Sequence, residues 1–199
     1  MRVGSLAPIV LGLALAGCGG AKPETPAVKV GTLEGDNALI ASAQKVSDVI
    51  GGCVRTSNTA AEDQVQSKVV GLEKGAIVML ACSQSAYSYT HRLFAISAAA
   101  PPQLLVLPDY DSTGWFASDQ ASMAELDAGT GVLTTLRKGG DKETCGSEGR
   151  YQWDGKRFAL QELHWQDCAT PSKSGPPFPI IWPTQQGAEV DPNGATPAP

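Results

Sequence analysis

Apolar residues recur every three to four positions in one stretch of the chain, from Asp36 to Ile50. This spacing places them on a single face of a helix. Asp36 is expected to cap the start of that helix, and Gly51-Gly52 its end. The pattern therefore predicts one amphipathic helix, with an apolar face made of Leu39, Ile40, Ala43, Val46, Val49 and Ile50.

Beyond this helix the apolar residues form short runs separated by turn residues, which is typical of β-strands. Turns are expected at 73–75, at Pro101-Pro102, at 127–131 and at Asp154-Gly155. Many short strands with regular turns predict a mainly β fold, a small antiparallel domain that is sandwich-like or barrel-like, with one N-terminal helix. Strands are expected at 67–72, 76–81, 92–97, 103–107, 122–127, 132–137, 149–153 and 156–163, with a short one at 179–182.

The dipeptide Asp154-Gly155 gives the most specific local prediction. Asp-Gly favours a two-residue type I′ turn, which would pair Trp153 with Lys156 and Tyr151 with Phe158. In that register one face of the hairpin is apolar and the other is polar. The apolar face holds Tyr151, Trp153, Phe158 and Leu160, and the polar face holds Arg150, Gln152, Arg157 and Gln161.

The first residues have the features of an export signal. Arg2 precedes an almost wholly apolar stretch at 6–16, which is too short for a membrane-spanning anchor but suits the core of a signal peptide. The sequence Leu15-Ala16-Gly17-Cys18 that ends it resembles the bacterial lipobox. It predicts cleavage after residue 17 and acylation of Cys18. Attached acyl chains, palmitate among them, would then hold the protein on a membrane. An ordinary secretory signal followed by a stray cysteine is the alternative.

Four segments follow from these patterns. They are the signal peptide at 1–17, a flexible tether at 18–35, a β domain at 36–183 and a disordered tail at 184–199, in which prolines and glycines are frequent and aromatic residues are absent. Because Gly19 and not an aspartate follows the lipobox cysteine, the outer membrane is favoured, with the domain facing the periplasm. Removing the signal leaves 14 Lys/Arg against 20 Asp/Glu, a net charge of −6. Together with the lack of a basic cluster, this charge argues against nucleic acid as a partner and leaves the lipid as the contact with the membrane.

Four cysteines remain after Cys18. An even number in an oxidising compartment predicts two disulfides. Cys145 and Cys168 flank the open end of the predicted hairpin, where a bond between them would close a loop of about 24 residues and contribute about 3 kcal/mol. Cys53 and Cys82 then form the second pair. The gaps are long and no Cys-x-x-Cys occurs, so a zinc site is disfavoured.

Several of these segments together resemble a known family. They are Cys82 to Tyr87, the strand that ends at Pro108, the stretch from Asp127 to Leu133, the segment from Cys145 to Cys168, and Trp182-Pro183. Their order and spacing are similar to the C-terminal half of the bacterial exported family called domain of unknown function 1176, over about residues 76–183. The segment from Cys145 to Cys168 is the most specific part. The resemblance implies an exported, disulfide-bonded protein and no particular activity.

Candidate catalytic and metal sites are weak in this sequence. His91 or His164 could serve a hydrolase, but no Gly-x-Ser-x-Gly elbow surrounds a serine. The segment from Asp109 to Gly114 starts like a calcium loop, yet its twelfth position is Gln120, so an acidic turn is the better interpretation. Glu125 and Asp127 share a strand face, which we expect to be exposed to solvent. No cofactor and no metal are expected.

Aromatic residues near predicted loops are the remaining candidates for a binding surface. They are Tyr87, Tyr89, Tyr110, Trp115 and Phe116, and packing at the ends of a small β core is the competing interpretation. The leading hypothesis is a non-enzymatic binding or structural module that contacts an envelope protein or glycan. One alternative is an inhibitor of a cell-wall hydrolase, similar to lysozyme inhibitors, because Ser85-Ala86-Tyr87 weakly resembles their inhibitory loops. The other alternative is an envelope hydrolase.

Overall fold

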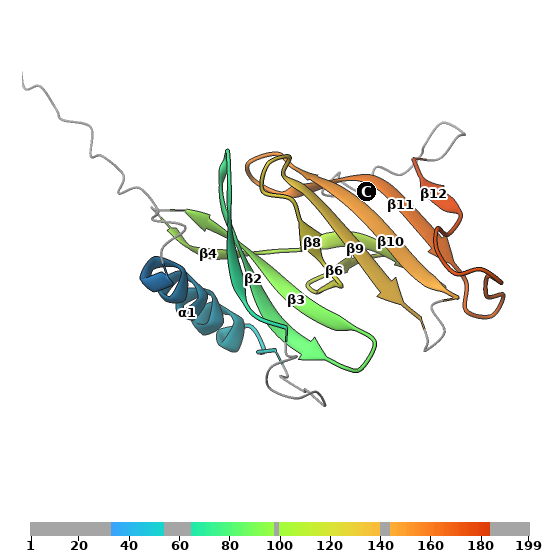
Figure 1. Ribbon diagram of the computed structural model, residues 1–199, viewed down its shortest axis with the longest axis horizontal. Coiled ribbons are helices and arrows are strands. Elements are labelled where there is room, and N and C mark those ends of the chain that lie inside the picture. The colour runs from blue at the N-terminus through green and yellow to red at the C-terminus, as the bar shows by residue number, and fades with distance from the viewer. Residues whose placement is uncertain (1–32, 54–64, 98–99, 140–143, 184–199) are drawn as a thin grey trace, which may run out of the picture.

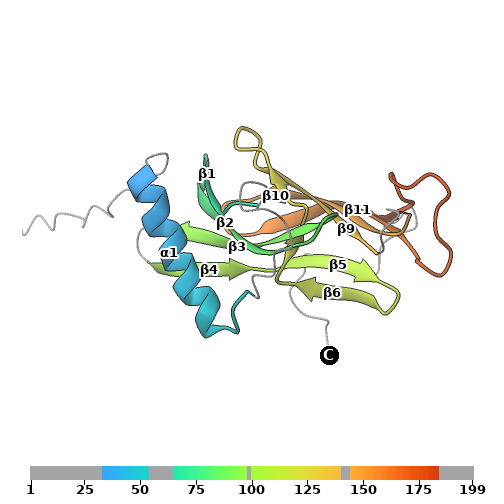
Figure 2. The same cartoon turned by 60° about the horizontal axis from the view of Figure 1, so that its bottom comes forward.

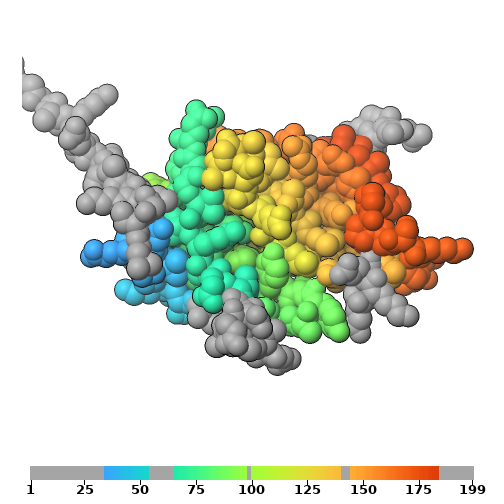
Figure 3. Space-filling model, viewed as in Figure 1, coloured from blue at the N-terminus to red at the C-terminus, as the bar shows by residue number. Residues whose placement is uncertain are grey.

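The computed structural model describes residues 33–53, 65–97, 100–139 and 144–183 (Figure 1). The predicted signal peptide, the acylated Cys18 and the predicted tail at 184–199 lie outside the described residues. Helix α1 (Leu33–Val49) packs on one face of a first β-sheet, and a second sheet packs against the other face. Along the long axis of the molecule the helix is followed by the first sheet and then by the second (Figure 3).

Helix α1 begins three residues before the predicted start, so Asp36 lies in its first turn and does not cap it. The last three residues assigned to the tether are therefore helical. The predicted end is confirmed: Gly51 and Gly52 have positive φ angles, and the Gly52 N–H donates to the Ser47 carbonyl at 2.7 Å. The predicted apolar face stops at Val46, because Val49 and Ile50 are 87% and 46% exposed. No helix in the described ranges has the length and hydrophobicity needed to cross a membrane.

The first sheet has the order β1-β2-β3-β4, and the short strand β7 pairs with β3. All of its pairings are antiparallel. Its inner strand β2 is apolar at every position from 76 to 80 because it lies between the helix and the second sheet (Figure 2). Ile77 and Met79 pack in the core between the sheets, while Val78 and Leu80 pack against the helix. The strands are β1 (Lys68–Leu72), β2 (Gly75–Gln84), β3 (Tyr89–Ser97), β4 (Ala100–Leu105) and β7 (Ala121–Ser122).

The second sheet has the order β12-β11-β10-β9-β8, again antiparallel, and β5 and β6 form a separate two-stranded sheet. The two larger sheets pack as a sandwich and do not close into a barrel, which agrees with the predicted mainly β fold. The strands are β5 (Leu107–Asp111), β6 (Gly114–Ser118), β8 (Glu125–Leu126), β9 (Val132–Lys138), β10 (Gly146–Trp153), β11 (Phe158–Gln166) and β12 (Ile180–Trp182).

Two predicted strands are split in the structure because the chain changes sheet within them. The strand predicted at 103–107 divides at the exposed Val106 into β4 and β5. The strand predicted at 122–127 divides at Met123, whose φ of 44° turns the chain from β7 in the first sheet to β8 in the second. The turn predicted at Pro101-Pro102 is also wrong: both prolines lie in β4, an edge strand, where missing N–H donors are tolerated.

The β10–β11 hairpin has the predicted faces but a different register. Trp153 pairs with Phe158, and Tyr151 pairs with Leu160, so the connection has four residues rather than two. The Asp154 carboxylate stabilises this loop, because it accepts the N–H groups of Lys156 and Arg157, each at 2.8 Å. A slip of two residues keeps every side chain on its face. The four predicted apolar side chains are accordingly all buried in the core between the sheets.

Both predicted disulfides are confirmed. Cys53 bonds to Cys82 and so fastens the end of the helical segment to β2, with the Cα atoms 4.8 Å apart. Cys145 bonds to Cys168 across the open end of the β10–β11 hairpin, with the Cα atoms 5.0 Å apart. Arg92 on β3 adds a polar attachment for the helix: it donates to the Ser47 hydroxyl at 3.0 Å and to the Asp119 carboxylate at 2.6 Å.

Candidate functional site

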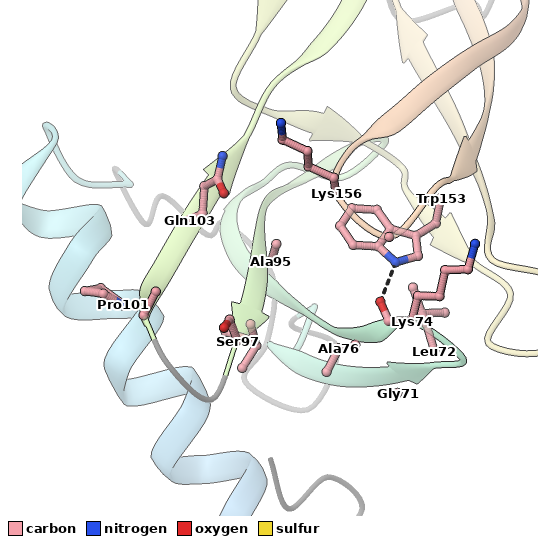
Figure 4. A pocket seen from close by; sticks show the side chains of 14 residues that line it. Gly71, Leu72, Lys74, Ala76, Ala95, Ser97, Pro101, Gln103, Trp153 and Lys156 are labelled. Carbon is pink, nitrogen blue, oxygen red and sulfur yellow. Dashed lines mark hydrogen bonds between the residues drawn. The ribbon is translucent and has the colours of Figure 1, made fainter. Parts of the chain in front are cut away.

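A groove of about 690 Å³ opens where the tips of two hairpins meet the ends of β3 and β4 (Figure 4). Its lining comes from three stretches of the chain that are far apart in sequence. These stretches are 71–76 at the β1–β2 tip, 95–97 and 100–103 at the ends of β3 and β4, and 153–156 at the β10–β11 tip. Strands β1 to β4 belong to the first sheet, and β10 and β11 belong to the second. The groove therefore lies at the boundary between the two sheets.

A hydrogen bond ties the two hairpin tips together at the groove. The indole Nε1 of Trp153 donates to the Lys74 carbonyl at 2.7 Å, and the Trp153 side chain is almost entirely buried. Gly155 lets the tips approach, since a Cβ there would lie 3.1 Å from Cδ of Lys74 and the φ angle is +99°. This wall of the groove is therefore built before any ligand arrives.

The groove combines apolar walls with a few polar groups. Leu72, Ala95 and Pro101 supply apolar surface, while Lys74, Lys156 and Gln103 are exposed and supply ammonium and amide groups. Among the described lining residues there is no Asp, Glu, His or Cys. Within the described chain no carboxylate lies within 4 Å of either ammonium. The arrangement can attract an anion and exchange hydrogen bonds, but it offers no acid–base pair for catalysis.

The two histidines lie away from the groove. His91 is buried beside Tyr89, and this burial lowers the pKa of its ring. His164 is held by two partners: Nδ1 lies 2.6 Å from the Phe178 carbonyl, and Nε2 lies 2.5 Å from the Glu162 carboxylate. Partial burial favours the neutral ring, but these bonds outweigh it and raise the pKa of His164. Neither imidazole meets a serine hydroxyl in the described residues, so no hydrolase triad is assembled there.

The segment considered as a calcium loop is the β5–β6 hairpin. Asp111 accepts the Thr113 N–H at 2.7 Å, as expected for an acidic turn. Asp109 is already engaged, because Arg137 Nε donates to its carboxylate at 2.8 Å. Tyr151 donates to the Pro108 carbonyl at 2.9 Å in the same region, and burial, aided by the negative charge of Asp109, raises the pKa of Tyr151. No group of three or more potential metal ligands occurs in the described part of the chain.

The structure places Tyr87 and Tyr89 in different environments. Tyr87 is 64% exposed at the tip of the β2–β3 connection, where the Ser85 N–H donates to the Ser88 carbonyl at 2.7 Å. Tyr89 is half-buried and packs edge-on against His91, with the ring centroids 5.6 Å apart. Packing at the end of the core, the competing interpretation, therefore does not hold for Tyr87, whose ring is exposed, whereas Tyr89 is partly packed.

The other predicted aromatic residues join a half-buried array. Tyr110 and Trp115 contact each other with centroids 5.4 Å apart. Tyr110 also contacts Trp165 at 5.1 Å, and Trp115 contacts Trp182 at 6.3 Å. Phe116 lies under the guanidinium of Arg137, 5.4 Å from its ring centroid. These contacts attach the β5–β6 hairpin to β9, β11 and β12, and none of these aromatic residues lines the groove.

The segment from Cys145 to Cys168 contains glycines that the packing requires. A Cβ on Gly146 would lie 2.9 Å from the carbonyl carbon of Arg137 on the neighbouring strand, and its φ angle is +134°. A Cβ on Gly149 would lie 2.7 Å from Cζ of Tyr151. Both approaches are closer than non-bonded atoms tolerate. These glycines build the second sheet, whereas Trp153, Gly155 and Lys156 in the same segment line the groove.

The family described as protein of unknown function (DUF1176) matches residues 20–185, most of the chain. The chain belongs to this family. The match begins well before residue 76, where the resemblance was expected to start, and so also covers helix α1 and strand β1. Searches of the curated proteins and of the solved structures found no significant match.

Sequence reasoning missed the groove. Its residues are supplied by separate turns, and only folding brings the tips of two hairpins together. The Glu73-Lys74-Gly75 and Asp154-Gly155 turns were both predicted, but nothing in their sequences indicates that they touch. Trp153 was the one available signal. A buried indole N–H needs a hydrogen-bond acceptor, and in the structure that acceptor, the Lys74 carbonyl, comes from outside the hairpin of Trp153.

Proposed function

We propose that this DUF1176 protein is a non-enzymatic binding module of the bacterial cell envelope, anchored in the outer membrane through acylated Cys18, and that the groove holds its ligand. The groove chemistry carries this proposal. Apolar walls with a few placed polar groups are typical of ligand sites. Lys74 and Lys156 are exposed rather than desolvated, whereas a lysine that acts as a base or nucleophile is usually buried to lower its pKa.

Affinity capture from an envelope extract tests the proposal. The protein without its signal and lipid is immobilised as wild type, as the groove-filling variant Gln103→Trp and as the remote variant Tyr87→Ser. Gln103 is exposed on an edge strand, so an indole at this position extends into the groove without disturbing the core. Wild type and Tyr87→Ser are expected to retain an envelope component that Gln103→Trp loses. Equal retention by Gln103→Trp, or recovery of a cleaved product, would contradict the proposal.

An inhibitor of a cell-wall hydrolase is the second candidate, favoured by the presentation of Tyr87. The ring is 64% exposed on a tight turn, close in sequence to Cys82, which is bonded to Cys53. A loop restrained in this way loses less conformational entropy when it enters an active site. Inhibition of lysozyme-type lysis of cell walls tests it. Under this candidate Tyr87→Ser abolishes inhibition with an unchanged melting temperature, while Gln103→Trp still inhibits. A wild type that does not slow lysis would refute it.

A further inference from the structure

Lys74 and Lys156 both line the groove, and their side chains extend on opposite sides of the Trp153 indole, Lys156 on the side of Gln103 and Lys74 on the far side (Figure 4). We propose that the groove binds a carboxylate-bearing ligand of about the size of a disaccharide or dipeptide, with its acidic groups held by these two ammoniums. This inference rests on the proposed binding function and specifies the chemistry of the ligand.

The charge of the groove runs against that of the chain. The chain carries 20 acidic and 15 basic residues, a net charge of −5, yet the described lining has two lysines and no acidic residue. Arg92, Arg137 and Arg157 each have a carboxylate partner, whereas no ion pair is formed by Lys74 or Lys156 within the described residues. Two ammoniums with no carboxylate among the described lining residues favour an anionic ligand over a cationic one.

The size and walls of the groove restrict the ligand further. Grooves of roughly 300–1,000 Å³ hold small molecules, and this one has about 690 Å³. The Gln103 amide both donates and accepts hydrogen bonds, so it can meet a hydroxyl or an amide on the ligand. Leu72, Ala95 and the edge of Trp153 offer apolar surface to the ligand body between its acidic groups.

The adjoining edge strand argues against a longer peptide that binds by adding a strand. Such a peptide pairs with the free N–H and C=O groups of an edge. Strand β4 is one of the two edge strands of the first sheet that contribute to the groove, and Pro101 and Pro102 remove two of its N–H donors, while β1 reaches the groove only with its last residues, Gly71 and Leu72. Recognition in the groove therefore depends on side chains, which suits a compact ligand.

Calorimetric titration with matched probes tests the inference. The acidic saccharide is digalacturonate, which carries two carboxylates, and its neutral counterpart is galactobiose. The acidic dipeptide is N-acetyl-glutamyl-glutamate, and its neutral counterpart is N-acetyl-glutaminyl-glutaminamide. At least one acidic probe is expected to bind more tightly than its neutral counterpart and to weaken as ionic strength rises. The acidic probe that binds identifies the source of the carboxylate.

Charge-matched variants complete the test. Lys74→Gln combined with Lys156→Gln is expected to weaken binding of the acidic probe about tenfold, the combined effect of two exposed ion pairs. The control removes two exposed lysines outside the groove, Lys45→Gln with Lys173→Gln, and should leave binding unchanged. No binding of either acidic probe, equal binding of acidic and neutral probes, or equal loss in both double variants would overturn the inference. If Gln103→Trp still loses the envelope component in that case, the proposed function stands and only the ligand chemistry is wrong.

Discussion

Gly149 lies under the ring of Tyr151, and replacing it with alanine should destabilise the domain. A Cβ at this position would be 2.5 Å from Cε2 and 2.7 Å from Cζ of that ring. Tyr151 is 1% exposed, and its hydroxyl donates to the Pro108 carbonyl at 2.9 Å. The ring cannot move away without leaving the core and breaking this bond. The new methyl group must therefore displace either Tyr151 or its own strand.

Three contributions set the expected change in the free energy of unfolding: two are destabilising and the third partly offsets them. Overpacking a core costs about 1–3 kcal/mol. Loss of the bond from Tyr151 to Pro108 would add about 1 kcal/mol. Removing a glycine from a strand returns about 0.5–1 kcal/mol, because the unfolded chain loses freedom. We expect Gly149→Ala to lower the free energy of unfolding by about 1–3 kcal/mol, and the melting temperature to fall by about 2–4 °C per kcal/mol for a domain of this size.

A double-mutant cycle in urea identifies the cause. Tyr151→Leu alone should be destabilising, because it leaves a cavity in the core and removes the bond to the Pro108 carbonyl. Leucine does not reach over Gly149, so adding Gly149→Ala to Tyr151→Leu should cost almost nothing. The expected coupling energy between the two positions exceeds about 1 kcal/mol. A cost for Gly149→Ala that is the same in both backgrounds, or below about 0.5 kcal/mol in wild type, would refute the reasoning.

Three further predictions concern other parts of the chain. The intact mass of protein extracted from membranes should correspond to a chain that starts at acylated Cys18; an unmodified Cys18 or cleavage elsewhere would contradict this. The pKa of His164 in the folded protein lies above its ordinary 6.5. Its bond to Glu162 therefore stabilises the fold fully below about pH 6.5, and this contribution is lost as pH rises through the folded pKa. The difference in urea midpoint between wild type and Glu162→Gln should therefore shrink with rising pH, and a constant difference would be inconsistent with this account. Gly146→Ala should lower the free energy of unfolding by at least about 2 kcal/mol, because its Cβ meets the Arg137 backbone; a wild-type urea midpoint would show that the strand adapts.

The parts of the fold that sequence reasoning predicted depend on local patterns. The β10–β11 hairpin is the clearest case: Tyr151 and Phe158 were assigned to the correct face although their register was wrong, because side chains alternate with period two. The Cys145–Cys168 bond was then predictable, since both cysteines lie beyond the open end in either register. The helix was found from its periodicity, and its start was missed because Asp36 resembles a cap but lies within the first turn.

The parts that could not be predicted depend on which segments meet in space. At Val106 and at Met123 the chain leaves one sheet and enters another, but the apolar pattern of the predicted strand continues across both residues. The pattern continues because an apolar residue can be buried equally well in either sheet. The sequence pattern carries no record of the sheet in which a strand pairs. The groove depends on the same missing information, since the contact between Lys74 and Trp153 joins positions 79 residues apart. Candidate aromatic residues were visible in the sequence, whereas the lysines gain significance only from their shared location.

The two disulfides have a mechanical consequence for the groove. Cys53–Cys82 joins the end of the helical segment to β2 of the first sheet, and Cys145–Cys168 closes a loop within the second sheet. Neither bond crosses from one sheet to the other. The two sides of the groove are therefore held to each other by the apolar core that both sheets share and by the bond from the Trp153 indole to the Lys74 carbonyl, and not by a disulfide. Reduction of both disulfides would remove cross-links within each half of the sandwich and none between the halves.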